Sequence, residues 1–354
     1  MRLDERIGIR STNINLIKFV CALAVIFSHA FAVAQNKDDV LANFNGGQCN
    51  IGGVAVAVFF FLSGLYVTKS LSKETSLKTF MWKRCKRIFP QLWIVVLACV
   101  LVLGPVVNVI CNKMSGVVNY VTSPATYLYL LNGLLIPIHN LPGVFESNYY
   151  QTVNGPLWTM PIEFVAYIAL AIIGVVAMII SKNNLVKSQR ISRILHICSF
   201  VFLTVCVIGL TFIGNAGMIM SVVRPLAIFF EGTLFYDYKD KLPLNWIMGV
   251  MCLFVLAVLC KTPFFNVGLV LIFPYAIASI GLGTKQIGKL PAFVNSSYEM
   301  YLCGWPIQQI VLLFFRGVMA PWLNFMLTIP FDVILGWGLL EFTERMNDRK
   351  NSRK

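Results

Sequence analysis

The sequence has little charge for its length. Only 12% of its 354 residues are Asp, Glu, Lys or Arg, whereas 58% are hydrophobic. Soluble domains are nearer one quarter charged and one half apolar, so this composition argues against a pair of soluble domains. The apolar residues instead gather in successive runs that are long enough to cross a bilayer. The composition therefore predicts an all-α, polytopic membrane protein.

Histidine is scarce, and the cysteines lack the spacing of metal ligands. The three histidines are His29, His139 and His196, and none of the ten cysteines forms a C-x-x-C pair. Most of the cysteines fall in or beside apolar runs, where cysteine behaves as a small hydrophobic residue. We therefore expect no metal. A disulfide between Cys49 and Cys111 stays an open alternative, because both residues could face outside.

The excess of basic residues does not form a nucleic-acid surface. The net charge is +14, but the basic residues lie between apolar runs rather than in a stripe with aromatic residues. In that position they act as orientation signals, and some could meet anionic lipid. We expect both termini to be cytoplasmic, because most of the basic residues then fall on the inner side. The first apolar run is too long for a cleavable signal peptide and is expected to remain as an anchor.

Ten apolar runs are predicted to span the membrane. A shorter run, 124–138, is interrupted by Asn132 and Gly133, and we expect it to be re-entrant or interfacial. It lies within the longest non-spanning piece, 112–156, which is predicted to be outside and is long enough to suggest a function. No internal repeat or appended soluble domain is visible, so residues 1–354 are predicted to form a single membrane domain. The predicted spans are 13–34, 51–69, 88–111, 157–181, 194–214, 218–237, 244–260, 264–282, 296–316 and 320–342.

Two ionisable residues mark the first predicted span. Lys18 and His29 lie close to three helical turns apart, so they share one face and are about 16 Å apart along the axis. Ionisable groups inside a bilayer are costly unless something uses or neutralises them. His29 is therefore either a proton-transfer group or a packed imidazole. Lys18 either binds a phosphate-bearing donor or extends to the inner interface.

Further charged residues fall near the ends of later spans. Arg84 and Arg87 share a helical face and could clamp phosphates, although a stop-transfer cluster explains their charge equally well. Glu163 lies at the outer mouth of the fourth span, where a carboxylate is costly unless it is paired or hydrated. Trp158 beside it fits an interfacial aromatic belt, or a platform for a sugar. Arg224, within the sixth span, is expected to meet another helix or a bound anion.

Taken together, these residues resemble the acyltransferase family 3, the multi-span membrane O-acyltransferases that modify cell-surface glycans. The resemblance covers essentially the whole chain, and the order and spacing of several motifs carry it. The chain departs from the family at two places: the family usually has arginine in place of Lys18, and often histidine where Gly304 precedes Trp305. The esterase-like domain that some members append is missing, so we expect the membrane part or a separate partner to complete the transfer. The motifs are Lys18-x10-His29, residues 59–64, Arg84-x-x-Arg87-Ile88-Phe89-Pro90, residues 158–163, Arg224 with Phe230 and Gly232, and residues 297–302.

The resemblance implies transfer of an acyl group, most simply acetyl, from acetyl-CoA to a hydroxyl of a cell-surface polysaccharide or its lipid-linked precursor. It places the protein in a bacterial cytoplasmic membrane and implies that His29 acts as base or acyl carrier, with Glu163 orienting it or the acceptor. Asn154 and Trp158 are expected to contact the acceptor. A transporter of a small acyl-bearing metabolite or glycolipid is the alternative, because buried ionisable residues also suit transport. The residues expected to bind the donor are Lys18, Arg84, Arg87 and Arg224.

Overall fold

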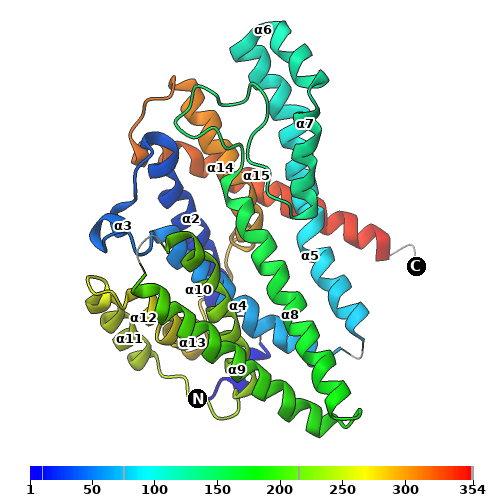
Figure 1. The fold of residues 1–354 in the computed structure, drawn as a ribbon, viewed down its shortest axis with the longest axis vertical. Helices are drawn as coiled ribbons and strands as arrows, with labels where there is room; N and C mark the ends of the chain where they lie inside the picture. The colour runs from blue at the N-terminus through cyan, green and yellow to red at the C-terminus, as the bar shows by residue number, and fades with distance from the viewer. Residues whose placement is uncertain (10, 75, 214–215, 352–354) are drawn as a thin grey trace. The chain divides into compact units, whose positions relative to one another are not determined.

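The computed structural model describes every residue except 10, 75, 214–215 and 352–354, and the side chains of 112, 113, 347 and 349–351 are also left out. The described residues form an all-α protein, as the composition predicts (Figure 1). The last residue of the predicted span 194–214 lies outside them. The chain divides into two compact units. The first unit comprises Met1–Cys21, Val40–Arg84 and Ile162–Leu290, and the second comprises Ala22–Asp39, Cys85–Pro161 and Pro291–Lys354.

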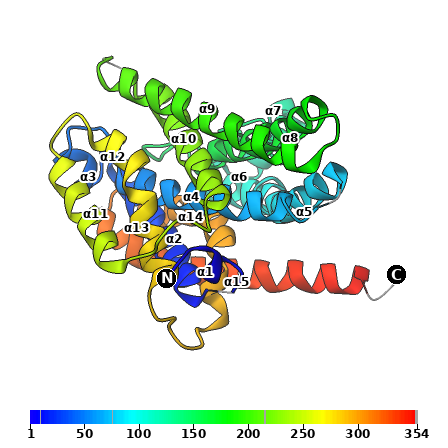
Figure 2. The same ribbon diagram turned by 90° about the horizontal axis from the view of Figure 1, so that it is seen from below.

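Two long helices of the first unit, α4 (Ile51–Leu71) and α10 (Gly217–Asp237), lie side by side (Figures 1 and 2). Glycines allow their backbones to approach closely. A Cβ atom on Gly64 would lie 2.0 Å from the carbonyl oxygen of Phe229, and one on Gly232 would lie 2.3 Å from that of Phe61. Small residues at a helix crossing are the usual means of close packing in membranes, where apolar burial does not favour helix association.

The other helices of the first unit surround this pair. Helix α9 packs against α10, and α11 packs against α13. Asn184 and Asn245 cap the first turns of α9 and α11 with their side-chain oxygens, which accept hydrogen bonds from backbone N–H groups. The bounds are α1 Asp4–Ile7, α3 Val40–Phe44, α9 Leu185–Thr211, α11 Trp246–Leu259, α12 Phe265–Leu271 and α13 Phe273–Gly283.

The second unit is built around α14 (Ser297–Phe314) and α15 (Pro321–Asn351), which pack along each other. Its buried apolar cluster includes Val33, Trp305 and Leu312, so the second half of α2 contributes to this core. Helices α2, α5 and α8 each give residues to both units. The remaining bounds are α2 Thr12–Gln35, α5 Leu77–Ala98, a π-helix at Cys99–Leu103, α6 Gly104–Thr122, α7 Pro124–Leu128 and α8 Thr159–Ile180, with 3-10 turns at Tyr129–Leu134, Gly155–Trp158 and Ala292–Asn295.

Seven helices among the described residues are long and apolar enough to cross a membrane, and an eighth span results if the bent pair α12 and α13 is counted as one. The chain is therefore a multi-pass membrane protein. The predicted span 244–260 contains only the 14-residue helix α11, and the predicted span 264–282 is broken by a bend of 42°. The total of ten spans and the cytoplasmic termini stay predictions.

The segment expected to be a long outer loop contains more helix than the sequence suggests. Helix α6 continues to Thr122, and the interrupted run 124–138 forms α7 and the 3-10 turn Tyr129–Leu134 before irregular structure begins. Asn132 stabilises that turn, because its side-chain amide donates hydrogen bonds to the carbonyls of Tyr129 and Ile138 at 2.9 Å each. Cys49 is buried and Cys111 is exposed, and the structure has no disulfide between them.

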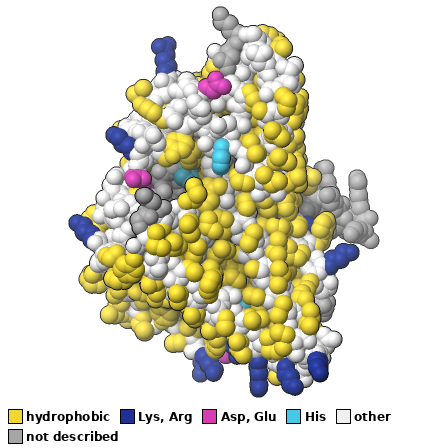
Figure 3. Space-filling model, in the orientation of Figure 1, with side chains coloured by type: hydrophobic (Ala, Val, Ile, Leu, Met, Phe, Trp, Pro, Cys, Tyr) yellow, Lys and Arg dark blue, Asp and Glu magenta, His cyan; other side chains and the backbone are white. Residues whose placement is uncertain are grey.

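Hydrophobic side chains cover much of the face that Figure 3 shows, and Lys and Arg side chains gather along its lower edge. The basic residues that begin the α9 region, Lys182, Lys187, Arg190 and Arg193, follow the apolar helix α8 directly. An apolar surface bounded by basic residues is typical of a protein whose sides face lipid and whose end faces water. The surface is therefore consistent with a membrane-embedded fold.

Candidate active site

Glu163 lies in a cluster of hydroxyl groups in the first unit. The hydroxyl of Ser63 on α4 donates a hydrogen bond to Oε1 of Glu163 at 3.1 Å, and the hydroxyl of Tyr167 donates to the same oxygen. The two hydroxyl oxygens are 2.9 Å apart. Ser63 belongs to the Phe-Phe-Phe-Leu-Ser-Gly motif, and Tyr167 follows Glu163 by one helical turn. The structure therefore fixes the orientation of this carboxylate through one residue of a motif and one residue that the sequence did not single out.

Lys18 lies beside an aromatic ring that a second lysine shares. Its Nζ is 5.6 Å from the ring centroid of Tyr66, and the Nζ of Lys69 is 5.9 Å from the same centroid. Both distances are within the range of cation–π attraction. Lys69 also donates a hydrogen bond to the carbonyl of Ile7. Lys18 thus belongs to a positively charged region at the end of α4 that includes Lys69.

The predicted pair Arg84 and Arg87 is divided between the two units. Arg84 donates to the hydroxyl of Ser70 at 3.3 Å, and its guanidinium lies 5.8 Å from the ring of Phe80. Arg87 is exposed to solvent at the structure's surface. Arg84 therefore lies close to the last turn of α4, the same end of that helix as Tyr66.

Arg224 is buried near the opposite end of α4. It is 6% exposed, and its Nη1 donates a hydrogen bond to Oδ1 of Asn266 at 2.5 Å. A Cβ atom on Gly53 would lie 2.9 Å from its Nη2, so the guanidinium packs closely on this glycine. Gly53 and Ser70 are separated by about 25 Å along the helix axis. The structure therefore does not bring Arg224 and Arg84 to one anionic group.

His29 packs against an aromatic residue of α14 in the second unit. The centroids of His29 and Trp305 are 5.0 Å apart, with the rings at 74° in an edge-to-face arrangement. Tyr150 also packs against Trp305, and the centroids of these two rings are 5.8 Å apart. Trp305 is held in place because its Nε1 donates to the carbonyl of Thr152 at 2.9 Å. His29 is thus only partly exposed, and Trp305 is a contact that the sequence interpretation missed.

The two predicted acceptor-binding residues differ in exposure. Asn154 is 1% exposed and donates to the carbonyl of Leu302 at 2.9 Å, which links the segment before α8 to α14. Trp158 is 38% exposed. A buried amide bound to the backbone has a structural role of its own, whereas an exposed indole is available to lipid or to a sugar.

The predicted site residues therefore divide between the units. Lys18, Arg84, Glu163 and Arg224 belong to the first unit, and His29, Arg87, Asn154 and Trp158 belong to the second. Within the first unit, Glu163 lies between the Arg224 end and the Arg84 end of α4. Among the residues that the structure describes, no group of three or more His, Cys, Asp or Glu side chains could hold a metal ion.

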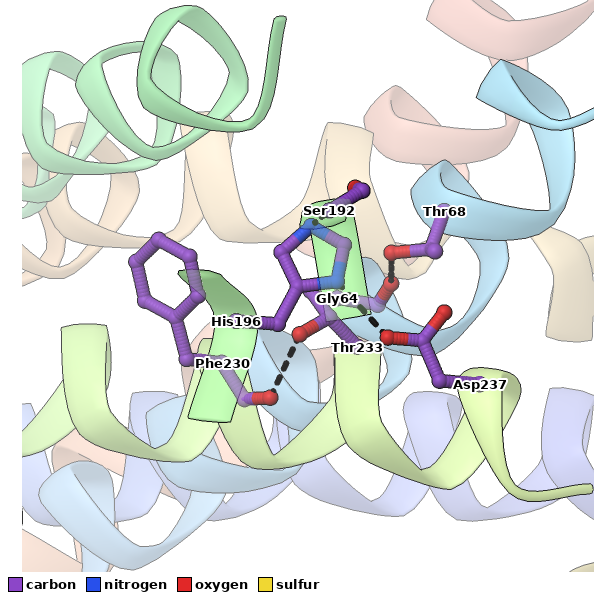
Figure 4. Close-up of polar contacts among 7 residues, drawn as sticks. All are labelled: Gly64, Thr68, Ser192, His196, Phe230, Thr233 and Asp237. Carbon is purple, nitrogen blue, oxygen red and sulfur yellow. Dashed lines mark hydrogen bonds and ion pairs between the residues drawn. The ribbon is translucent and has the colours of Figure 1, made fainter. Parts of the chain in front are cut away.

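A second histidine cluster was not expected from the sequence. His196 on α9 is 2% exposed, and its Nδ1 is 2.7 Å from Oδ2 of Asp237 at the end of α10 (Figure 4). Its Nε2 is 3.4 Å from the hydroxyl of Ser192, one turn earlier on α9. This pair joins α9 to α10. Because the two residues are far apart in sequence, no local sequence pattern indicated that they would meet.

A pocket of about 340 Å³ lies between α6 and residues 142–146 of the second unit. Amide, hydroxyl and carboxylate groups line it together with apolar surface. The sequence interpretation assigned function to the whole segment 112–156 but did not identify these residues together. The lining residues are Asn108, Ser115, Gly116, Asn119, Tyr120, Pro142, Gly143 and Glu146.

A family model and one relative match nearly the full chain. Residues 11–341 match the family described as an acyltransferase domain, the acyltransferase family 3. The chain is 24% identical over 347 residues to the O-acetyl transferase of Shigella phage Sf6. The matched region covers 94% of this chain and 95% of that protein. It is 28% identical over 165 residues to nodulation protein 10 of Rhizobium leguminosarum bv. viciae. This matched region covers 45% of this chain and 42% of that protein. No solved structure matches. The chain therefore belongs to the acyltransferase family 3 and is a multi-pass membrane acyltransferase.

Proposed function

We propose that the protein is an O-acetyltransferase of a bacterial cytoplasmic membrane. It moves an acetyl group from acetyl-CoA to a hydroxyl of a cell-surface polysaccharide or of its lipid-linked precursor. The observation that carries this proposal is the similarity to the O-acetyl transferase of phage Sf6, which extends over almost the full length of both chains. The pocket beside α6 supports a glycan acceptor, because amide, hydroxyl and carboxylate groups that can bind sugar hydroxyls line it together with apolar surface.

His29 acts in this proposal as the general base for the acceptor hydroxyl. An imidazole accepts a proton near neutral pH and returns it within one turnover. Its edge-to-face contact with Trp305 restricts the rotation of the ring, which favours one direction of attack. The hydroxyl oxygen forms a bond to the carbonyl carbon, the carbon–sulfur bond breaks, and the hydroxyl proton passes by way of His29 to the leaving sulfur.

Glu163 acts as an orienting carboxylate in the same proposal. Ser63 and Tyr167 both donate to its Oε1, so the group is held as a hydrogen-bond acceptor with a defined direction. A carboxylate held in this way can orient an imidazole or an acceptor hydroxyl.

The cations at the inner end of α4 act as the donor site. Lys18 lies with Lys69 at the ring of Tyr66, and Arg84 lies at Ser70, one turn further along α4. A group of cations suits the phosphates of a nucleotide thioester. Arg87, which belongs to the second unit, is proposed to bind the donor as well. Arg224 lies about 25 Å away along α4, so it meets a different part of the donor or stabilises developing negative charge.

The test is acetyl transfer by the purified full-length protein in lipid nanodiscs, with isotopically labelled acetyl-CoA and a glycan acceptor. The wild-type protein is expected to transfer label to the glycan. His29→Gln is expected to lower the rate at least about 100-fold, the lower range for loss of a general base.

The matched control replaces the exposed histidine of the outer segment, His139→Gln. Its transfer rate is expected to equal that of the wild type. Full transfer by a well-expressed His29→Gln variant would remove His29 from the chemistry. Stable uptake of label without any product would instead favour the transport alternative.

A further inference from the structure

Three polar residues follow one face of α15 inside the second unit. Asn324, Thr328 and Asp332 are spaced by four residues, so they lie one above another over about 12 Å. Each of the three is 0% exposed. Their surroundings are apolar, since the neighbouring part of α15 packs on the cluster of Trp305, Leu312 and other hydrophobic residues. Helix α15 therefore carries a buried polar row through an apolar core.

The facing helix α14 adds a fourth member, Gln308, which is also 0% exposed. The amide nitrogens of the row are already engaged. Nε2 of Gln308 donates to the carbonyl of Ile26 at 2.7 Å, and Nδ2 of Asn324 donates to the carbonyl of Gln308 at 3.1 Å. Five oxygen atoms of the row, however, have no hydrogen-bond partner among the residues that the structure describes: Oε1 of Gln308, Oδ1 of Asn324, Oγ1 of Thr328, and Oδ1 and Oδ2 of Asp332.

Buried oxygens in such number require a partner. An unsatisfied buried polar atom loses the hydrogen bonds it makes in water, and five of them together would cost an amount comparable with the whole stability of a domain. The nearby amide donors are used, so the partner must donate hydrogen bonds to these oxygens and also accept one from the hydroxyl of Thr328 and from the protonated carboxyl group of Asp332. Water is the ordinary molecule of this kind in protein interiors, where each buried water bonds to two to four polar atoms.

The row ends close to the proposed base. A Cβ atom on Gly304 would lie 3.7 Å from Oδ1 of Asp332 and 3.0 Å from Cγ1 of Ile26, so the carboxyl group faces the backbone of α14 at this glycine. The next residue, Trp305, contacts His29. On the other side the row is closed, because Met300 packs directly on Gly336, where a Cβ atom would lie 2.9 Å from its Cγ. Asp332 and His29 therefore lie against consecutive residues of α14, Gly304 and Trp305.

We propose that this row is a hydrated proton-exchange site, in which Asp332 and about four water molecules, at ordinary hydrogen-bond spacing, exchange protons with His29. Asp332 is a positioning residue in this scheme and holds a proton at rest. When the imidazole takes the proton of the acceptor hydroxyl, the row takes up one proton from His29 and so restores the neutral ring. The row then releases one proton through His29 to the departing thiolate. The transfer as a whole neither releases nor consumes a proton. The coupling to His29 rests on the proposed function, whereas the hydration of Asp332 does not.

The hydration is tested by infrared spectroscopy of the full-length protein in nanodiscs. The spectrum of Asp332→Asn is subtracted from that of the wild type. The difference isolates the C=O stretch of a protonated Asp332 carboxyl group. A hydrated acid is expected to shift within seconds of transfer to D₂O, whereas a dry acid would shift only over the hours that protected core amides need. Absence of the band, or exchange over hours, would overturn the proposal. So would loss of the band in sodium but not potassium buffer, because the row would then be a cation site.

The coupling is tested by kinetics. Asp332→Asn is expected to lower kcat about tenfold and to raise the solvent isotope effect, with the KM of both substrates within about twofold of the wild type, because proton return becomes slow while binding is unchanged. Asp332→Glu should recover part of the rate. Unchanged kcat in Asp332→Asn, with an inactive His29→Gln, would overturn the coupling alone. An active His29→Gln would overturn the proposed function and leave the infrared result standing.

A further variant covers the case in which Asp332→Asn does not fold. Thr328→Val removes one hydroxyl of the row and keeps the shape of the side chain. It is expected to slow the D₂O shift of the Asp332 band and to lower kcat in the same direction. An unchanged D₂O shift and an unchanged kcat in this variant would both contradict a continuous row.

Discussion

At the level of individual residues, the hydroxyl groups at Glu163 explain how an intramembrane carboxylate is kept in one orientation. Ser63 and Tyr167 approach the same oxygen from α4 and α8. Two donors on one oxygen align the carboxylate and partly replace the water that it loses on burial. The arrangement leads to a specific expectation for the kinetics of variants at the two donors.

Tyr167→Phe and Ser63→Ala are each expected to lower kcat about tenfold, because Glu163 loses one of its two orienting donors. The double variant should lose less than the product of the two single effects, since both hydroxyls act on one atom. The measurement is a double-mutant cycle on the acetyl-transfer rate. Tyr275→Phe, which removes an exposed hydroxyl elsewhere in the first unit, serves as the control. Fully multiplicative effects would show that the two hydroxyls act independently.

Lys18 provides a second prediction for a single residue, in which affinity rather than turnover should change. Lys18→Gln is expected to raise the KM for the acetyl donor about tenfold while kcat stays nearly constant, because a cation that binds phosphate acts on the ground state and the transition state alike. Lys18→Arg should keep the wild-type KM or lower it. Lys285→Gln is the charge-matched control in a loop. A fall in kcat at constant KM would assign Lys18 to the chemical step.

For whole helices, the crossing of α4 and α10 depends on two glycines rather than on hydrophobic area. Gly64→Ala is expected to destabilise the protein by about 1–3 kcal/mol, because its Cβ would overlap the backbone of Phe229. The loss is measured as the melting temperature in detergent. Gly209→Ala is the matched control on α9, where nothing lies within 4 Å of the added atom. It should be neutral or slightly stabilising, since alanine is the better helix former. Equal melting temperatures for both variants would contradict the close crossing.

The helices were predictable where a long apolar run has no interruption. The predicted spans 51–69 and 218–237 correspond closely to α4 and α10, because hydrophobicity alone is enough to locate such runs. The run 264–282 was expected to be one helix, but it bends by 42° just before Pro274, whose nitrogen cannot donate a helix hydrogen bond. Helix α6 extends into the presumed loop as far as Thr122, whose hydroxyl donates to the carbonyl of Val118 at 2.9 Å.

The site was predictable by residue type but not by contact. Charged residues inside apolar runs are rare enough to stand out, and for that reason Glu163 and Arg224 were found. Tyr167 and Asn266 were not, and Trp305 was noted only for its place after Gly304. Tyrosine, asparagine and tryptophan are ordinary in such runs, and the importance of these three comes from contacts with residues distant in sequence. Asp332 was not identified from the sequence for a different reason. It lies in the final span, outside every motif of the resemblance.

Across the whole chain, the distribution of basic residues predicts an orientation that can be measured. Lys37 and Lys187 are both exposed, and three candidate spanning helices, α4, the helix that starts at Leu77, and α8, lie between them. An odd number of crossings places the two positions on opposite sides of the membrane. The positive-inside rule then places Lys187 in the cytoplasm and Lys37 outside.

In a variant without native cysteines, Lys37→Cys is expected to react with a membrane-impermeant maleimide on intact cells, and Lys187→Cys only after permeabilisation. Val201→Cys, on the exposed face of α9, should stay unlabelled until detergent is added, because that face meets lipid. Labelling of Lys37→Cys and Lys187→Cys from the same side would mean that one of the three helices does not cross. Labelling of Lys187→Cys alone on intact cells would reverse the orientation and place the cations at the inner end of α4 on the side without acetyl-CoA.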